Sequence, residues 1–297
     1  MALEPRAVVV HRRTEYDDLL ARHGTPGQAD FFLRHRGLRL AEVAARHTAV
    51  RGAVAEVSAA IPPSWRRAVV ERADLSRFAF EAEDIVVVVG PDGLVANVAK
   101  YLDGQPVVGV DPEPGRNAGL LVPHSAAAAG RLLRAAATGG ADVLERTMVA
   151  ARTDDGEALV ALNEVYVGHA SHQSARYRLG LGDRAEVQSS SGLLVGTGTG
   201  STGWLRSLWH DRGERGELPA PADPDLAWYV REAWPSRTTG ATLVEGRLAE
   251  SEQLVVDAQS DSLVCFGDGI ESDAIVLAYG QRLSIRRSER LLRWVAG

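Results

Sequence analysis

Residues 86–93 read VVVVGPDG, and they give the clearest indication of how this chain folds. The four consecutive valines predict a strand that is buried on both faces, which is typical of a parallel sheet. The strand ends at a Gly-Pro-Asp-Gly turn, and apolar residues return at helical spacing over residues 94–102. This order places the Asp92 carboxylate at the carboxyl edge of the sheet, where open α/β sheets bind ligands. An Asp-Gly pair by itself marks only a turn.

The first half of the chain alternates strand and helix signals around this run. Short apolar strands are expected at residues 6–11 and 106–110, and an alanine-rich helix at residues 39–61 that two prolines terminate. The order strand, helix, strand implies a right-handed βαβ unit. We expect Ser125 to cap a last helix that runs to about Ala137. These signals predict an α/β domain with a mostly parallel sheet over residues 1–123.

The second half changes to short, closely spaced strands. A hairpin is expected over residues 147–167, around the turn Asp154-Asp155-Gly156. Further strands are expected at residues 175–181, 193–195, 242–245, 254–257, 274–278 and 282–286. Closely spaced strands of this kind predict an antiparallel, sandwich-like β domain over residues 124–297. The expected fold class is therefore α/β followed by all-β.

Composition excludes several classes of protein. The 297 residues include 45% hydrophobic ones, enough for a substantial core, and the net charge of −6 argues against a general nucleic-acid binder. Cys265 is the only cysteine, so intrachain disulfides are excluded. No apolar run approaches the roughly 20 residues that span a bilayer, and the amino-terminal segment carries charges where a signal peptide needs an apolar core. We expect a cytoplasmic protein without a membrane partner.

A second glycine-rich segment, GTGTGSTGW, occupies residues 196–204. Its glycines allow close backbone approach to a ligand, and its four hydroxyl-bearing residues supply small hydrogen-bonding groups. Ser201 or Thr202 could cap a helix running toward Trp209 and present the amide end of that helix to an anion. The alternative interpretation is a flexible turn with a helix cap. The segment is not a P-loop, because the Gly-Lys-Ser/Thr ending is missing.

The pair Asn163-Glu164 interrupts an apolar, strand-like run over residues 161–167. Buried polar side chains are costly unless they have partners. Ligand binding is one explanation, and the emergence of the strand's end at the surface is the other.

Together these three segments resemble the NAD kinase family. The turn at residues 90–93 is similar to the Gly-Gly-Asp-Gly turn of that family, Asn163-Glu164 to its Asn-Glu pair, and residues 197–204 to its Thr-x-Thr-Gly-Ser-Thr stretch. The closer similarity is to the mitochondrial type and its bacterial relatives, which share the Thr-Gly-Thr-Gly-Ser loop followed by tryptophan. Residues 109–119 and 230–232 resemble further stretches of that subgroup.

The resemblance implies that the chain transfers the γ-phosphoryl group of ATP, or of polyphosphate, to the 2′-hydroxyl of the adenosine ribose of NAD. Asp92 would then be the general base that accepts the hydroxyl proton. Magnesium would be held mainly by the nucleotide phosphates, with Asp92 as one carboxylate ligand. No further metal-binding residue is expected. The active site would lie in the cleft between the two domains, and the β domain would support a homodimer or tetramer.

The resemblance also assigns the binding residues. Arg116 is the cationic candidate for the phosphates, since a guanidinium offers a bidentate fork to oxygen anions. Asn163 and Glu164 would bind the adenosine part of NAD. The remaining candidates for substrate and nucleotide binding are Gly90, Gly93, Thr199, Gly200, Ser201, Thr202 and Trp204. A buried helix residue is the alternative for Trp204, and a surface arginine is the alternative for Arg116.

Two residues of the first turn depart from the family pattern. Pro91 replaces the second glycine, which removes an amide donor, and Leu94 stands where the family has threonine. These departures favour two alternatives to NAD phosphorylation. One is a kinase of another nucleotide or ribose-bearing metabolite, and the other is a homologue that binds a nucleotide without phosphorylating it.

Overall fold

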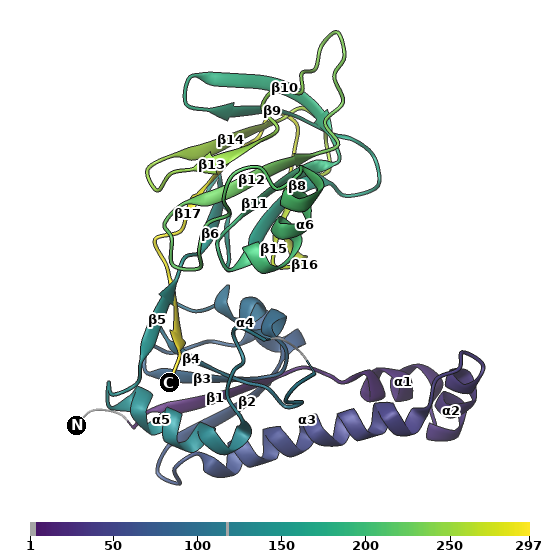
Figure 1. Cartoon of the computed structure of the whole chain (residues 1–297), viewed down its shortest axis with the longest axis vertical. Coiled ribbons are helices and arrows are strands. Elements are labelled where there is room, and N and C mark those ends of the chain that lie inside the picture. The colour runs from purple at the N-terminus through teal and green to yellow at the C-terminus, as the bar shows by residue number, and fades with distance from the viewer. Residues whose placement is uncertain (1–3, 117–118) are drawn as a thin grey trace. The chain divides into compact units, whose positions relative to one another are not determined.

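The computed structural model describes residues 4–116 and 119–297, which belong to two compact units (Figure 1). The first unit extends to Leu144 and includes the returning end of the chain, Arg293–Gly297, and the second comprises Glu145–Leu292. No helix in the described part of the chain is both long and apolar enough to cross a membrane.

The first unit is a parallel sheet covered by helices. Its elements are β1 (Arg6–His11), α1 (Glu15–His23), α2 (Pro26–Arg34), α3 (Leu40–Ala60), β2 (Arg66–Glu71), η1 (Arg72–Arg77), β3 (Asp84–Val89), α4 (Asp92–Ala99), β4 (Pro106–Val110), η2 (Ala126–Ala128), α5 (Ala129–Ala137), β5 (Val143–Arg146) and β18 (Leu292–Val295). The strand order is β2-β1-β3-β4-β18-β5, and the pairings from β2 through β1, β3 and β4 to β18 are all parallel.

The expected buried strand is β3, in which every residue from Asp84 to Val89 is buried. Residues Val87 and Val89 pack on one face against Val57 of α3 and Leu132 of α5. Figure 1 shows α4 over the opposite face of this sheet. Helices on both faces explain why the strand needs apolar residues at every position.

Helices α1 and α2 fold back on the amino-terminal half of α3 (Figure 1). A capping box starts α1, because the Thr14 hydroxyl accepts from the Asp17 amide at 3.3 Å and the Asp17 carboxylate accepts from the Thr14 amide at 2.9 Å. These three helices share a small apolar core of their own, which includes Leu19, Leu33 and Val43.

The second unit consists of two antiparallel six-stranded sheets. Its elements are β6 (Val149–Thr153), β7 (Ala158–Ala161), β8 (Glu164–His169), β9 (Ala175–Leu181), β10 (Arg184–Ser190), β11 (Gly192–Gly196), η3 (Gly200–Thr202), α6 (Trp204–Asp211), β12 (Leu226–Arg231), β13 (Glu245–Leu248), β14 (Gln253–Ala258), β15 (Leu263–Gly267), β16 (Ile270–Leu277) and β17 (Arg282–Arg287). The sheet orders are β10-β9-β14-β17-β6-β7 and β13-β12-β11-β8-β15-β16. One continuous apolar core, to which both sheets contribute, includes Tyr177, Leu193, Trp228 and Ile285.

The structure therefore confirms the expected fold class and corrects several details. The expected division lay after residue 123, and the compact units divide after Leu144, so that α5 lies with the parallel sheet of the first unit. The chain expected to form one hairpin over residues 147–167 forms three strands, since it breaks at Leu162-Asn163 between β7 and β8. The expected strand at residues 242–245 begins at Glu245. Ser125 precedes a short 3-10 helix and makes no side-chain capping bond.

Candidate functional site

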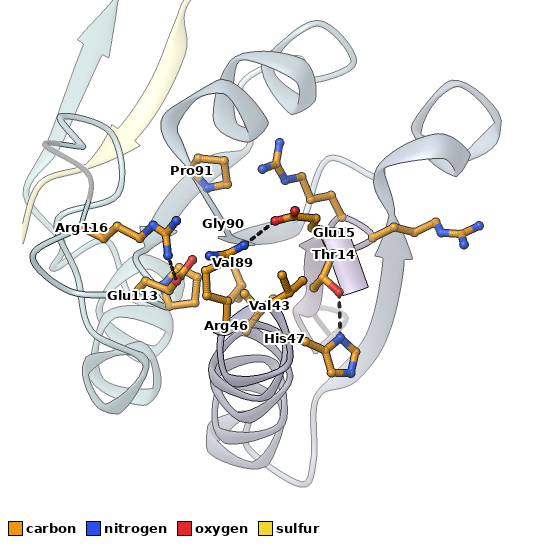
Figure 2. Close-up of a pocket in the computed structure, with 14 residues that line it drawn as sticks. Thr14, Glu15, Val43, Arg46, His47, Val89, Gly90, Pro91, Glu113 and Arg116 are labelled. Carbon is orange, nitrogen blue, oxygen red and sulfur yellow. Dashed lines mark hydrogen bonds and ion pairs between the residues drawn. The ribbon is translucent and has the colours of Figure 1, made fainter. Parts of the chain in front are cut away.

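The predicted site residues fall into two groups, one in each unit. The first group lies at the carboxyl edge of the parallel sheet, where the loops that follow β1, β3 and β4 line a pocket of about 290 Å³. Gly90 and Pro91 line it from the end of β3, and Arg116 from the loop after β4. Figure 2 shows the labelled side chains of α1, α3 and the strand ends converging on this pocket.

Four arginines line the pocket, namely Arg12, Arg13, Arg46 and Arg116, together with the carboxylates Glu15 and Glu113. Arg46 pairs with Glu15, and Arg116 pairs with Glu113 at 3.2 Å, as the dashed lines in Figure 2 mark. The four guanidinium groups outnumber the two carboxylates, so the pocket carries a net positive charge. Guanidinium groups of this kind suit the oxygens of phosphates.

The start of α1 and the helix α3 contribute pocket residues that sequence reasoning missed. Thr14 and His47 line the pocket and contact one another, with the Thr14 hydroxyl 2.7 Å from Nδ1 of His47. Arg46 lies one residue before His47 on the same helix. The sequence offered only the capping pattern at Thr14 as a local signal, and nothing in it placed α3 beside the end of β3.

Asp92 is the first residue of α4, and backbone amides hold its carboxylate. Oδ2 accepts a hydrogen bond from the amide of Leu120 at 2.7 Å, and Oδ1 accepts one from the amide of Leu121 at 2.9 Å. The side chain is partly exposed, and each oxygen retains a lone pair for a ligand. Neither Asp92 nor Gly93 lines the pocket, although the two residues before them do.

The two departures in the first turn fit the backbone. Pro91 is the N-cap of α4 in an extended conformation, with φ −75° and ψ 164°, which the proline ring permits. Leu94 is buried and covers Gly90, because a Cβ atom on Gly90 would lie 2.9 Å from Cδ2 of Leu94. The Gly90 amide already donates to the carbonyl of Val110 at 3.1 Å. The turn therefore offers a ligand no amide from either of its first two residues.

The second group surrounds the break between β7 and β8 in the other unit. The carbonyl of Asn163 accepts from the Thr197 amide at 2.8 Å, and the carbonyl of Leu162 accepts from the Thr197 hydroxyl at 2.6 Å. Gly200 lies against the same peptide, since a Cβ atom there would be 2.4 Å from the Asn163 oxygen. The glycine-rich loop and the Asn-Glu pair, which are far apart in sequence, are thus in direct contact.

Most hydroxyls of the loop are used within the protein. The Ser201 hydroxyl donates to the Thr197 carbonyl at 3.2 Å, and the Thr202 hydroxyl donates to the Thr199 carbonyl at 3.1 Å. The Thr199 hydroxyl is buried and has no hydrogen-bond partner among the described residues. An unsatisfied buried hydroxyl is costly, which makes Thr199 the member of the loop best suited to a ligand. The expected caps are not formed, because Gly203 is the N-cap of α6.

Glu164 is largely removed from solvent and lies beside Asp268, a residue that sequence reasoning missed. Burial, together with the charge of Asp268, raises the pKa of Glu164 from its ordinary value near 4.5 to about 8. Glu164 is therefore protonated at neutral pH and can donate a hydrogen bond. Strongly shifted carboxylates of this kind are concentrated at functional sites.

Trp204 begins α6 and packs on Tyr166 of β8. The two rings stack with centroids 5.3 Å apart and planes inclined by 24°, and the Arg231 guanidinium lies 5.4 Å from the Trp204 ring. Tyr166 itself lies across Gly168 and Gly192, at both of which a Cβ atom would collide with its ring. Trp204 is partly buried and packs against Tyr166, so its role in binding a base stays a prediction.

The donor groups at the first turn suit a magnesium ion that arrives with a nucleotide. In residues 4–116 and 119–297, no group of three or more His, Cys, Asp or Glu side chains could hold a metal ion. Magnesium usually binds one or two carboxylates together with substrate phosphates and water. The partly exposed Asp92 supplies one such carboxylate. Asn117 and Ala118, which belong to the family-like stretch at residues 109–119, lie outside the described residues.

Comparison with known proteins supports the fold. No family model and no curated protein sequence matches this chain. The structure is similar to the crystal structure of yeast NADH kinase complexed with NADH, with a TM-score of 0.59 and 15% identity over 99% of this chain and 84% of that one. The resemblance seen in the sequence is thereby confirmed at the level of architecture, while the mitochondrial-type placement stays a prediction. This chain has the fold of an NAD(H) kinase.

Proposed function

We propose that this chain is an NAD kinase-like phosphotransferase, which moves the γ-phosphoryl group of ATP, or of polyphosphate, to the 2′-hydroxyl of NAD. The observation that carries this proposal is the turn at residues 90–93. Its first two residues line the arginine-rich pocket, and the next residue, Asp92, has a carboxylate that backbone amides orient. The similarity to an NADH kinase supports the same chemistry through the fold.

The phosphoryl donor would bind with its phosphates in the pocket of the first unit. Arg12, Arg46 and Arg116 supply guanidinium groups there. These groups neutralise the charge that phosphoryl transfer spreads over the phosphate oxygens. Asp92 would help to hold a magnesium ion that arrives with the nucleotide, and the charge of that ion would add to the neutralisation.

NAD would bind with its adenosine part on the second group. Glu164, protonated at neutral pH, would donate to an oxygen or nitrogen of the ligand, and the Thr199 hydroxyl would gain the partner it lacks. Asp92 would accept the proton of the ribose hydroxyl as that oxygen attacks the γ-phosphorus, and the bond to the nucleoside diphosphate would break. A homo-oligomeric state and a cytoplasmic location also belong to this proposal.

One observation favours a second candidate, a homologue that binds a nucleotide without phosphorylating it. The first two residues of the turn offer no amide, and both oxygens of Asp92 already accept amide hydrogen bonds. An engaged carboxylate of this kind could serve to order the loop at Leu120-Leu121 rather than to accept a proton.

A coupled assay for NADP formation separates the two candidates. The native chain would be tested with ATP or polyphosphate as donor, NAD or NADH as acceptor, and magnesium present. Asp92→Asn would be compared with Asp103→Asn, which alters an exposed carboxylate of the same unit. The kinase proposal expects product from the native chain and from Asp103→Asn. Calorimetric binding of ATP or NAD without product from any donor and acceptor pair would overturn the kinase and leave the binding protein.

A further inference from the structure

The loop between β15 and β16 is a two-residue hairpin turn formed by Asp268 and Gly269. Both residues have a left-handed backbone, with φ of 52° and 69°. This is the conformation of a type I′ turn, for which Asn-Gly and Asp-Gly are the preferred sequences. From the sequence alone, the pair is an ordinary hairpin turn.

The Asp268 carboxylate, however, takes part in a contact more than a hundred residues away in sequence. It accepts from the backbone amides of Leu162 at 2.8 Å, Asn163 at 2.7 Å and, more weakly, Glu164 at 3.4 Å. The Asp268 amide in turn donates to the Glu164 carbonyl at 3.1 Å. Asp268 therefore binds the backbone amides of all three consecutive residues, 162–164, at the break between β7 and β8.

The same segment is held from its carbonyl side by Thr197, through the two bonds described above. The amide of Asn163 is thus fixed by Asp268, and its carbonyl is fixed by Thr197. The backbone of Asn163 is therefore fixed on both sides, and its side chain can change position only by rotation about its own χ angles. Precise placement of binding groups depends on supporting contacts of this kind.

We propose that Asp268 is a positioning residue for the NAD subsite, acting through the backbone amides of residues 162–164 to orient Asn163 and Glu164. This inference rests on the proposed function. Besides accepting these amide hydrogen bonds, the Asp268 carboxylate acts through its charge on the neighbouring Glu164 carboxyl. Asp268 is the charged group in the described structure that affects Glu164 in this way. Burial is the larger cause of the raised pKa of Glu164, and the charge of Asp268 adds to it, so Asp268 contributes to keeping Glu164 a hydrogen-bond donor.

The variant Asp268→Asn separates this role from that of the turn. Asn-Gly is at least as favourable as Asp-Gly in a type I′ turn, so the hairpin is retained. The substitution removes the negative charge and replaces one acceptor oxygen by a donor NH₂ group, which cannot accept from an amide. The matched control is Asp155→Asn, in the exposed turn between β6 and β7, where an aspartate also precedes a glycine.

The first measurements use the ligand-free chain. In Asp268→Asn we expect amide hydrogen exchange to accelerate at least tenfold at Leu162 or at Asn163, whichever amide then faces the NH₂ group, and the carboxyl NMR titration of Glu164 to move to lower pH. The second measurement is NAD binding by calorimetry at pH 7, where we expect affinity to fall at least tenfold. The KM for NAD should rise with little change in the KM for ATP. Asp155→Asn should match the native chain in each readout.

Each alternative outcome is distinct. Unchanged exchange and titration in Asp268→Asn would overturn the inference whether or not NAD binds. Changed exchange with unchanged NAD affinity would reduce Asp268 to a structural role and also overturn it. A native chain that binds no NAD would overturn the proposed function and the NAD subsite together. The exchange data would then still report the hydrogen bonds from the amides of residues 162–164 to Asp268. Asp268→Glu, which keeps the charge and displaces the oxygens, should retain the raised titration of Glu164 without restoring NAD affinity.

Discussion

The Oδ1 atom of Asp92 lies 2.9 Å from the backbone nitrogen of Leu121, and this hydrogen bond joins the proposed base to the loop that follows β4. Leu121 is itself held on its other side, because its carbonyl accepts from the indole nitrogen of Trp294 at 2.9 Å. Gly109 allows this close approach, since a Cβ atom there would lie 1.8 Å from the Leu121 oxygen. The orientation of the Asp92 carboxylate is therefore set before any ligand arrives.

Asp92→Asn tests both roles of this carboxylate. We expect the rate of NADP formation to fall by roughly 10²-fold or more, because an amide cannot accept the ribose proton. The free energy of unfolding should fall by about 1–3 kcal/mol, because the NH₂ group would face a backbone amide that loses its acceptor. Steady-state kinetics and chemical denaturation measure the two effects. A fully active Asp92→Asn variant would contradict the assignment of Asp92 as the base, and Asp103→Asn is the control.

Pro91→Gly tests the first departure from the family pattern. The substitution returns an amide donor to the edge of the pocket, so we expect a lower KM for ATP and a higher kcat. The free energy of unfolding should fall by roughly 1 kcal/mol, because glycine adds conformational freedom to the unfolded chain. Pro63→Gly, at an exposed site after α3, controls for that backbone effect. A lower activity in Pro91→Gly would show that the proline belongs to the working site.

Arg46→Gln tests the part of the pocket that the sequence did not predict. The change removes a guanidinium and leaves Glu15 without its ion-pair partner beside the phosphates. We expect the KM for ATP to rise roughly tenfold, equivalent to about 1.4 kcal/mol, with little change in the KM for NAD. Arg51→Gln is the matched control, since Arg51 lies on the same helix but outside the pocket. Equal effects of the two substitutions would place the phosphates elsewhere.

Gly200→Ala tests the contact between the glycine-rich loop and Asn163. The added Cβ atom would lie 2.4 Å from the Asn163 oxygen, so the loop or the Asn163 peptide must move. We expect a loss of about 1–3 kcal/mol in the free energy of unfolding and weaker NAD binding. Gly180→Ala on β9 is the control, because its nearest atoms would be at an ordinary 3.8 Å. Calorimetry with NAD and thermal denaturation would measure both, and a neutral Gly200→Ala would contradict the close packing.

Glu164→Gln tests the shifted carboxyl through the pH dependence of stability. The unfolded chain releases this proton near pH 4.5, whereas the folded chain holds it until about pH 8. The native chain therefore loses stability as the pH rises between these values, and the substitution removes that loss. We expect Glu164→Gln to be more stable than the native chain by a few kcal/mol at pH 8.5, and to differ little at pH 4. Equal stability differences at both pH values would show that the Glu164 pKa is not raised.

Much of the fold could be predicted from the sequence because its signals are local. The buried strand β3 follows from its continuous apolar run, the long helix α3 from its alanine-rich composition, and the strand β9 from its alternation of buried and exposed residues. The turn that carries Asp92 follows from the residues next to it. The helices α1 and α2 were missed although Thr14 and Asp17 form a capping box, because each helix is only nine residues long.

The candidate site was predictable only in part. The sequence alone determined which segments could carry chemistry, since the turn at Asp92, the pair Asn163-Glu164 and the glycine-rich loop have unusual polar composition. The tertiary structure decided which of these groups are free and which are engaged. It placed Arg46 beside Arg116, left the Thr199 hydroxyl without a partner, and directed Asp268 at Asn163. Hydrogen bonds between residues a hundred positions apart depend on strand order and register, and no local pattern of side chains encodes them.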